Sequence, residues 1–206
     1  MRVRSCVDNQ GKIKRIYEVE DETINKCDKK VEMEVSMPIF MIGYKDCIED
    51  SEEIVKKHIA IEILLNMLLG KSSNLYKELY NSGKLISEPD FDYEFSKQYA
   101  HILISGQSKD YNEIYKKIKE QVNNYKNNGL DSEHFERIKR KIYGDYVSEY
   151  NSVSDIARMF LADSFKGINS FDYIEKYNEI TKQYVDQILK EVFIEDKMVL
   201  SVINPK

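Results

Sequence analysis

The spacing of apolar residues along this sequence changes in an order that excludes a regular parallel α/β fold. Strand-like alternation comes first, helical spacing follows, and a predicted hairpin, a block of helices and a final strand complete the chain. In a parallel α/β fold, strands and helices alternate throughout the chain, and the order found here does not alternate in this way. The sequence therefore predicts an α+β fold, in which an antiparallel or mixed β-sheet is backed by helices on one face.

The predicted early strands differ in how much of their surface should be buried. Alternation over Ile13–Val19 and, more strictly, over Val31–Val35 predicts strands with one buried face and one solvated face. Pro38 ends the second of these strands. The nearly continuous apolar run Ile39–Lys45 that follows is typical of a central strand that is covered on both faces.

The remaining segments predict helices around a hairpin. Lys84–Phe91 and Lys97–Gln107 have the side chains of two antiparallel strands, and Lys197–Pro205 predicts a final strand. Helical spacing predicts helices over Ile54–Leu69, before Gly83, from Asp110 to Gly129, over Asp131–Tyr150, from Ser152 to Gly167 and from Thr181 onward. The sequence shows no linker or internal repeat, so we expect one domain over residues 1–206.

The tripeptide Gly-Lys-Ser that begins at Gly70 is the last part of a phosphate-binding loop. Such a loop needs a second glycine five residues before the Gly-Lys pair, and that position is Leu65. It also follows a buried strand, whereas Ile54–Leu69 has helical spacing. We therefore expect two helices here: Gly70 ends the first in a left-handed turn, and Ser72 or Ser73 caps the second.

The bulk composition excludes several classes of partner. The 206 residues carry a net charge of −5, whereas nucleic-acid binding requires a clustered positive excess. The basic segment Arg137–Gly144 is interrupted by Ile138 and Ile142 at helical spacing, which is typical of a solvated helix face. No apolar run approaches the roughly 20 residues that cross a bilayer, and residues 1–10 have no signal-peptide core. We expect a cytoplasmic protein that binds neither nucleic acid nor membrane.

Residue types that carry chemistry are scattered. The cysteines form no CxxC pair and no histidine has another within five residues, so a disulfide framework or self-contained zinc site is not expected. His101 lies in a predicted strand and is interpreted as a core or cross-strand histidine, with a functional role as the alternative. Asp92 and Glu94 share one side of an extended segment, where they could act as acid and base or hold a cation. Solvated carboxylates are the commoner outcome.

A set of motifs occurs in a distinctive order over nearly the whole chain after about Ile13. The motifs are PIFMIGYKD from Pro38, LLGKSSNLYKELYNSGKLI from Leu68, YAHILISGQS from Tyr99, FERIKRKIYGDYV from Phe135, NSVSDIARMF from Asn151 and FDYIEKYNEIT from Phe171. In this order they resemble the C-terminal, non-zinc domain of insulinase-type zinc peptidases. The resemblance is to the short bacterial members related to mitochondrial processing peptidase.

This resemblance implies the non-catalytic half of a two-domain peptidase. In the family, the first domain carries the zinc motif HxxEH with a downstream glutamate, and this sequence contains no HxxEH. Zinc is therefore expected in a partner, either a zinc-bearing N-terminal domain or a separate HxxEH subunit, whose zinc-bound water hydrolyses the peptide. The half that this sequence resembles would close a chamber around a peptide substrate, help to position it, and be inactive alone.

In many members this half also supplies an arginine and, a few residues later, a tyrosine that contact the peptide. Tyr80 stands near the arginine position and Ile86 near the tyrosine position, so the pair is absent here. Tyr80, Lys84 and His101 are the candidate substrate-binding residues, because they lie on the matching elements.

Two alternative functions and two expectations about the whole protein accompany the resemblance. The chain could be a degenerate peptidase-fold domain that acts as a protein-binding or scaffold module. It could also be a stand-alone enzyme that uses Asp92 and Glu94. Because the predicted sheet begins almost at the start of the sequence, a fragment of a longer protein is favoured over a natural short one. A dimer of the chain is a further expectation.

Overall fold

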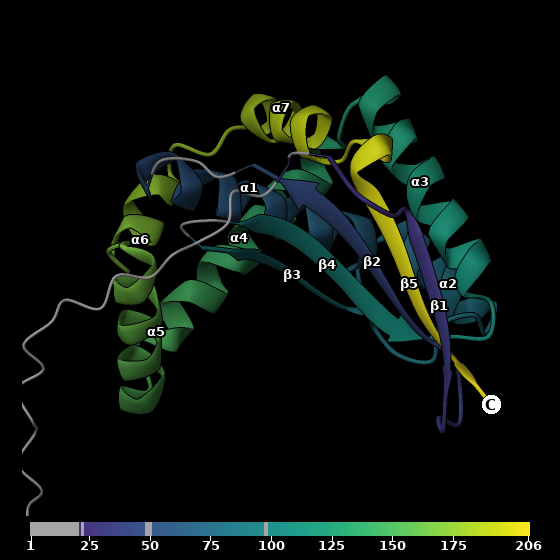
Figure 1. The fold of residues 1–206 in the computed structure, drawn as a ribbon. Helices are drawn as coiled ribbons and strands as arrows, with labels where there is room; N and C mark the ends of the chain where they lie inside the picture. Colours follow the sequence, from purple (N-terminus) through teal and green to yellow (C-terminus); the bar gives the residue numbers. More distant parts are fainter. Residues whose placement is uncertain (1–20, 22, 48–50, 97–98) are drawn as a thin grey trace, which may run out of the picture.

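A mixed sheet lies at the centre of the part of the chain that the structure describes (Figure 1). The computed structural model describes residues 21, 23–47, 51–96 and 99–206. The strands are β1 (Asp28–Met33), β2 (Ile39–Asp46), β3 (Asp90–Phe95), β4 (Ala100–Gln107) and β5 (Met198–Pro205), in the order β1-β5-β2-β4-β3. β1 pairs with β5 in parallel, and the other neighbours are antiparallel.

Helices cover one face of this sheet and leave the other open (Figure 1). They are α1 (Ser51–Leu69), α2 (Asn74–Asn81), α3 (Tyr111–Asn128), α4 (Ser132–Glu149), α5 (Val153–Lys166), α6 (Asp172–Tyr177), α7 (Lys182–Val192) and the short 3-10 helix η1 (Glu195–Lys197). α1 contacts the sheet through β3, and α4, α6 and α7 pack against α1. The predicted α+β class, with helices on one face, is confirmed.

The core lies between α1 and the sheet. Alternate residues of β2 point toward the helices, so Phe40, Ile42 and Tyr44 are buried. Apolar side chains on more than one side of α1 are buried too, among them Ile61 and Ile63, which point to opposite sides of the helix. Burying a side chain of this size contributes about 1.5–3 kcal/mol, so this helix is a major source of stability.

One charged side chain of α1 is also buried. The Nζ of Lys57 lies 2.8 Å from the carboxylate of Asp46 at the end of β2, and both side chains are about 5% exposed. The hydroxyl of Tyr93 on β3 donates a hydrogen bond of 2.6 Å to the same carboxylate. This network joins a helix and two strands, and it supplies the partners that a buried ion pair needs.

Two predictions about buried strand faces are wrong. β2 is central, as expected, but only one of its faces is covered, because Met41 on the other face is 43% exposed. β1 ends at Met33 and so excludes Val35, and Met33 is itself 51% exposed.

The side chain of Lys30 on β1 points toward the helices, where its ammonium group lies over the ring of Tyr111. The apolar residues of β1 alternate with Lys30 and therefore face the open side of the sheet. The predicted strand over Ile13–Val19 lies outside the described residues.

The predicted helix ends and hairpin largely agree with the structure. β3 and β4 form the expected hairpin, but β3 begins at Asp90, after Pro89, whose ring nitrogen cannot donate to a strand ladder. Ser152 and Thr181 cap α5 and α7 through their hydroxyl oxygens. No helix in the described ranges is long and apolar enough to cross a membrane. The cytoplasmic location stays a prediction.

Gly70 joins α1 to α2 in an unexpected way. Ser73 caps α2, as predicted, by accepting a hydrogen bond of 3.0 Å from the backbone N–H of Tyr76. The prediction of a left-handed turn at Gly70 is wrong, because only Gly83, Gly129 and Gly167 have positive φ among the described residues. Glycine is needed at position 70 because a Cβ there would lie 2.5 Å from the backbone oxygen of Asn66.

Replacing Gly70 with alanine should therefore reduce the free energy of unfolding by about 1–3 kcal/mol, the usual cost of overpacking. Gly144→Ala is the matched control, because Gly144 lies inside α4 and an added Cβ meets nothing within 4 Å. The control should be neutral or stabilising by up to about 1 kcal/mol, since glycine disfavours a helix. Urea unfolding measures both, and equal stabilities would contradict the close approach at Gly70.

Candidate functional site

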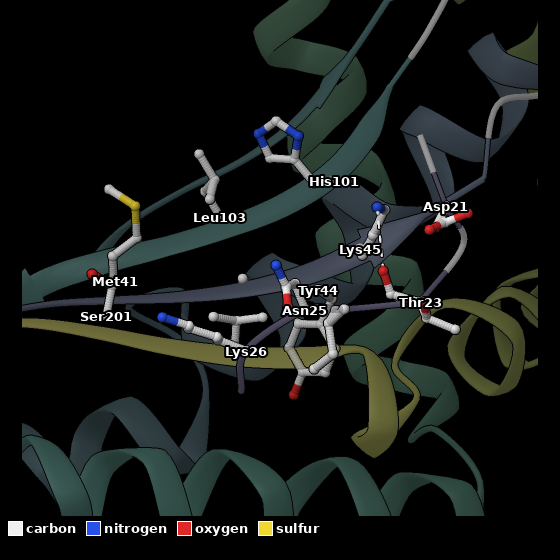
Figure 2. Close-up of a pocket in the computed structure, with 13 residues that line it drawn as sticks. Asp21, Thr23, Asn25, Lys26, Met41, Tyr44, Lys45, His101, Leu103 and Ser201 are labelled. Carbon is white, nitrogen blue, oxygen red and sulfur yellow. Dashed lines mark hydrogen bonds between the residues drawn. The ribbon is translucent and has the colours of Figure 1, made fainter. Parts of the chain in front are cut away.

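The open face of the sheet holds a hollow of about 860 Å³ (Figure 2). Its floor is formed by residues of the three central strands that point away from the helices. These residues are Met41, Gly43 and Lys45 of β2, His101 and Leu103 of β4, and Val199 and Ser201 of β5. Residues 21 and 23–26 form one wall, and the backbone oxygen of Thr23 lies 3.5 Å from the Nζ of Lys45. The hollow is therefore bounded by both the sheet and the chain that precedes β1.

The floor has a polar end and an apolar part. Strand register places His101 opposite Lys45 on one side and opposite Glu94 on the other. Met41 and Leu103 lie farther along the same strands, on the same face as His101 (Figure 2). Such a surface can receive apolar side chains and hydrogen-bond the polar groups of an extended ligand, whereas nothing in it resembles a nucleophile–base pair.

The structure brings only one of the three predicted substrate-binding residues to this hollow. His101 lines it and stacks on Tyr99, with ring centroids 5.5 Å apart. Tyr80 lies on α2, exposed and stacked on Tyr76. Lys84 pairs with Glu113 of α3, and its carbonyl accepts a hydrogen bond from Ser108. Contact of Tyr80, Lys84 or His101 with substrate stays a prediction.

Asp92 and Glu94 share one side of β3, as predicted, because both pair with open-face residues of β4. Asp92 is exposed and accepts a hydrogen bond from the backbone N–H of Tyr93. An acid–base role for this pair stays a hypothesis.

The residues present do not fit a zinc site. Within the described ranges, no group of three or more histidine, cysteine, aspartate and glutamate side chains could hold a metal ion. The sequence also has no HxxEH motif. We therefore derive no catalytic step through a metal held by this chain.

A second polar cluster, which sequence analysis did not single out, surrounds the middle of α1. His58 Nδ1 lies 2.7 Å from the hydroxyl of Tyr173 on α6, and burial lowers the pKa of His58 to about 4. One turn later, Glu62 accepts a hydrogen bond from the hydroxyl of Tyr146 on α4, and burial raises the pKa of Glu62 to about 7. His58 and Glu62 are four residues apart on one helix face, which was the available sequence signal.

The raised pKa of Glu62 predicts a pH dependence of stability. A carboxyl whose pKa rises on folding binds more protons in the native state, so its contribution is lost as pH rises from 4.5 toward 7. Across this window, Glu62→Gln should gain about 1–3 kcal/mol relative to the wild type, because glutamine does not ionise. Urea unfolding at several pH values measures the difference, with the exposed Glu136→Gln as control. A constant difference between Glu62→Gln and the wild type would contradict the buried carboxyl.

Comparisons with known proteins agree with this architecture. The family described as "Peptidase M16 inactive domain" matches residues 5–142. The zinc protease YmfH of Bacillus subtilis is 25% identical over 200 residues, which cover 96% of this chain and 46% of YmfH. An M16-like peptidase from Alicyclobacillus acidocaldarius has a TM-score of 0.87 at 22% identity, over 93% of this chain and 46% of that one.

A peptidase M16 inactive domain from Pseudomonas fluorescens has a TM-score of 0.75 at 17% identity, over 95% of this chain and 47% of that one. The chain thus spans about half the length of the relatives that it matches. The solved structures share its fold, and the family match covers more than half of its residues. The resemblance inferred from the motifs is confirmed: this chain belongs to the peptidase M16 inactive-domain family.

Proposed function

We propose that this chain is the non-catalytic half of an M16-type zinc peptidase. In this proposal, residues 1–206 form one domain that closes a peptide-binding chamber and helps to position the peptide. Zinc and the hydrolytic groups belong to a zinc-bearing N-terminal domain or a separate HxxEH subunit. The single observation that carries the proposal is the uncovered, partly apolar face of the sheet.

The side chains on the open face of the sheet support the proposal that another molecule or domain covers this face. A sheet with one face in water normally places polar side chains there. Here Met33, Met41, Leu103 and Val199 lie on the open side, and the two methionines are among the most exposed apolar residues of their strands. Methionine adapts to varied apolar shapes, which suits a wall that must accept different peptide side chains.

His101 is the residue that we assign to peptide contact. Its imidazole can donate or accept a hydrogen bond, as the backbone of an extended peptide requires. Lys45 and Glu94 flank it on the neighbouring strands and add a donor and an acceptor. Tyr80 and Lys84 do not line the hollow, so the proposal does not depend on them.

Peptide cleavage in a quenched mixed-peptide library tests the proposal. The purified chain alone should show no cleavage, and zinc-dependent cleavage should appear only when an HxxEH-bearing half is added. Leu103→Glu should then reduce kcat/KM by roughly tenfold, because it places a charge in the apolar part of the hollow. Val147→Glu, at an exposed apolar position on α4, is the control and should leave kcat/KM unchanged. Cleavage by the chain alone would refute the proposal.

A second function, a protein-binding module without peptidase activity, is favoured by one feature of α5. Its exposed face carries Val153, Ala157, Leu161 and Phe165 at intervals of four residues, and Phe165 is 77% exposed. Apolar residues at this spacing form a continuous stripe along a helix, and such stripes are commonly covered by a partner.

Sedimentation of the chain with and without the HxxEH-bearing half distinguishes the two functions. Association that Phe165→Asp weakens by roughly tenfold would assign the stripe to the zinc-bearing half. Because Phe165 is exposed, the variant should retain the melting temperature of the wild type. Self-association with no binding to the HxxEH-bearing half would favour the module, with a second copy of the chain as its partner.

A further inference from the structure

A second cavity, of about 160 Å³, lies where α1, α4, α5 and α6 meet. It shares no lining residue with the hollow on the open face. The lining residues that matter here are two carboxylates, three tyrosines and a histidine: Glu149, Asp163, Tyr146, Tyr150, Tyr173 and His58. None of the functions considered above uses this cavity.

Asp163 is a buried carboxylate whose nearest hydrogen-bond partner is a neutral hydroxyl. The residue is only 8% exposed, and its Oδ2 accepts a hydrogen bond of 2.6 Å from the hydroxyl of Ser170. The structure gives Oδ1 no hydrogen-bond partner and Asp163 no salt bridge within the described ranges. Lys166, one turn later on α5, instead stands over the ring of Phe95, with its Nζ 4.3 Å from the ring centroid. Oδ1 of Asp163 is therefore able to accept a hydrogen bond from a cationic group that enters the cavity.

Glu149 adds negative charge at the exposed rim of the same cavity. Burial, followed by the carboxylates of Asp155 and Asp163, raises the pKa of Glu149. His58 does not offset this charge, because burial lowers its pKa to about 4 and keeps it neutral at pH 7. The lining therefore contains two carboxyl groups and neither a lysine nor an arginine.

Three of the lining residues are tyrosines whose hydroxyls already make hydrogen bonds. The hydroxyl of Tyr146 donates to Glu62, that of Tyr173 hydrogen-bonds to His58, and that of Tyr150 donates to the carbonyl of Ser170. The tyrosine rings themselves can attract an organic cation, because the face of an aromatic ring carries partial negative charge. Rings together with carboxylates are a recognition set for ammonium and guanidinium groups.

We propose that this cavity binds the charged head of an aliphatic ammonium or guanidinium compound, with Asp163 as its principal counter-charge. The volume equals that of about five water molecules, which suits a charged head with a few methylene groups. A calcium ion would need six to eight oxygen ligands, which this lining does not supply. That the head comes from a lysine or arginine side chain of a peptide rests on the proposed function.

Titration of the isotopically labelled chain, followed by its amide NMR spectrum, tests the proposal. n-Butylammonium and agmatine should each shift the amides of cavity residues in a saturable way, whereas n-butanol, which lacks the charge, should not. Absence of saturable shifts with both cations, or equal shifts with n-butanol, would overturn the proposal. N-acetyl-lysine-methylamide and its norleucine counterpart then distinguish a peptide side chain from a free amine as the source.

Asp163→Asn should raise the Kd for n-butylammonium by at least about tenfold, because the charged partner is lost and the shape is kept. Asp110→Asn is the matched control, since Asp110 is an exposed carboxylate at the start of α3, which does not line the cavity. Its Kd should remain that of the wild type. An equal Kd for Asp163→Asn and the wild type would overturn the role of Asp163.

Glu149→Gln keeps the test decisive if Asp163→Asn does not fold. Glu149 is exposed, so the variant should fold, and its Kd should rise by about threefold through the loss of one nearby charge. An unchanged Kd would contradict the electrostatic account. All these measurements use this chain without a zinc-bearing half, so their failure leaves the proposed peptidase function unaffected.

Discussion

The burial of α1 is the constraint on which the rest of this structure depends. The helix has 19 residues and carries buried apolar side chains on several sides, so it must be covered both by the sheet and by other helices. The sheet supplies one cover, and α4, α6 and α7 supply the other. α1 and the helices that pack on it thereby lie on one face of the sheet, and the opposite face has no helix over it (Figure 1).

The polar groups of α1 follow from the same constraint. Lys57 and Glu62 lie on a helix that is enclosed on most sides, and each has a partner on another element, Asp46 and Tyr146. Removing one partner of a buried ion pair leaves an uncompensated charge, so such a pair fixes how the elements around it pack. Asp163 differs, because it is buried beside a cavity with only a neutral hydroxyl as its partner. Lys57 and Glu62 therefore join elements of the fold, whereas Asp163 is suited to bind a ligand.

Some of the candidate site could be predicted from local pattern, and some could not. His101 is a candidate from the sequence because it lies on an element that the family resemblance matches, and the hairpin that holds it forms as expected. The role of Met41 was missed, because a continuous apolar run is the same for a strand covered on both faces and for one covered on a single face. His58 and Tyr173 meet across 115 positions of sequence, a separation at which local periodicity carries no information.

The sequence by itself determined the class of fold, most helix and strand positions, and the family, because these depend on local periodicity and on the order of short motifs. Only the tertiary structure decided which face of the sheet stays open and that Gly70 serves a close approach rather than a left-handed turn. It also decided that a carboxylate on α5 lines the same cavity as three tyrosines from α6 and from α4 with its C-cap. The reason is that burial and charge environment depend on residues far apart in the chain, which no local pattern specifies.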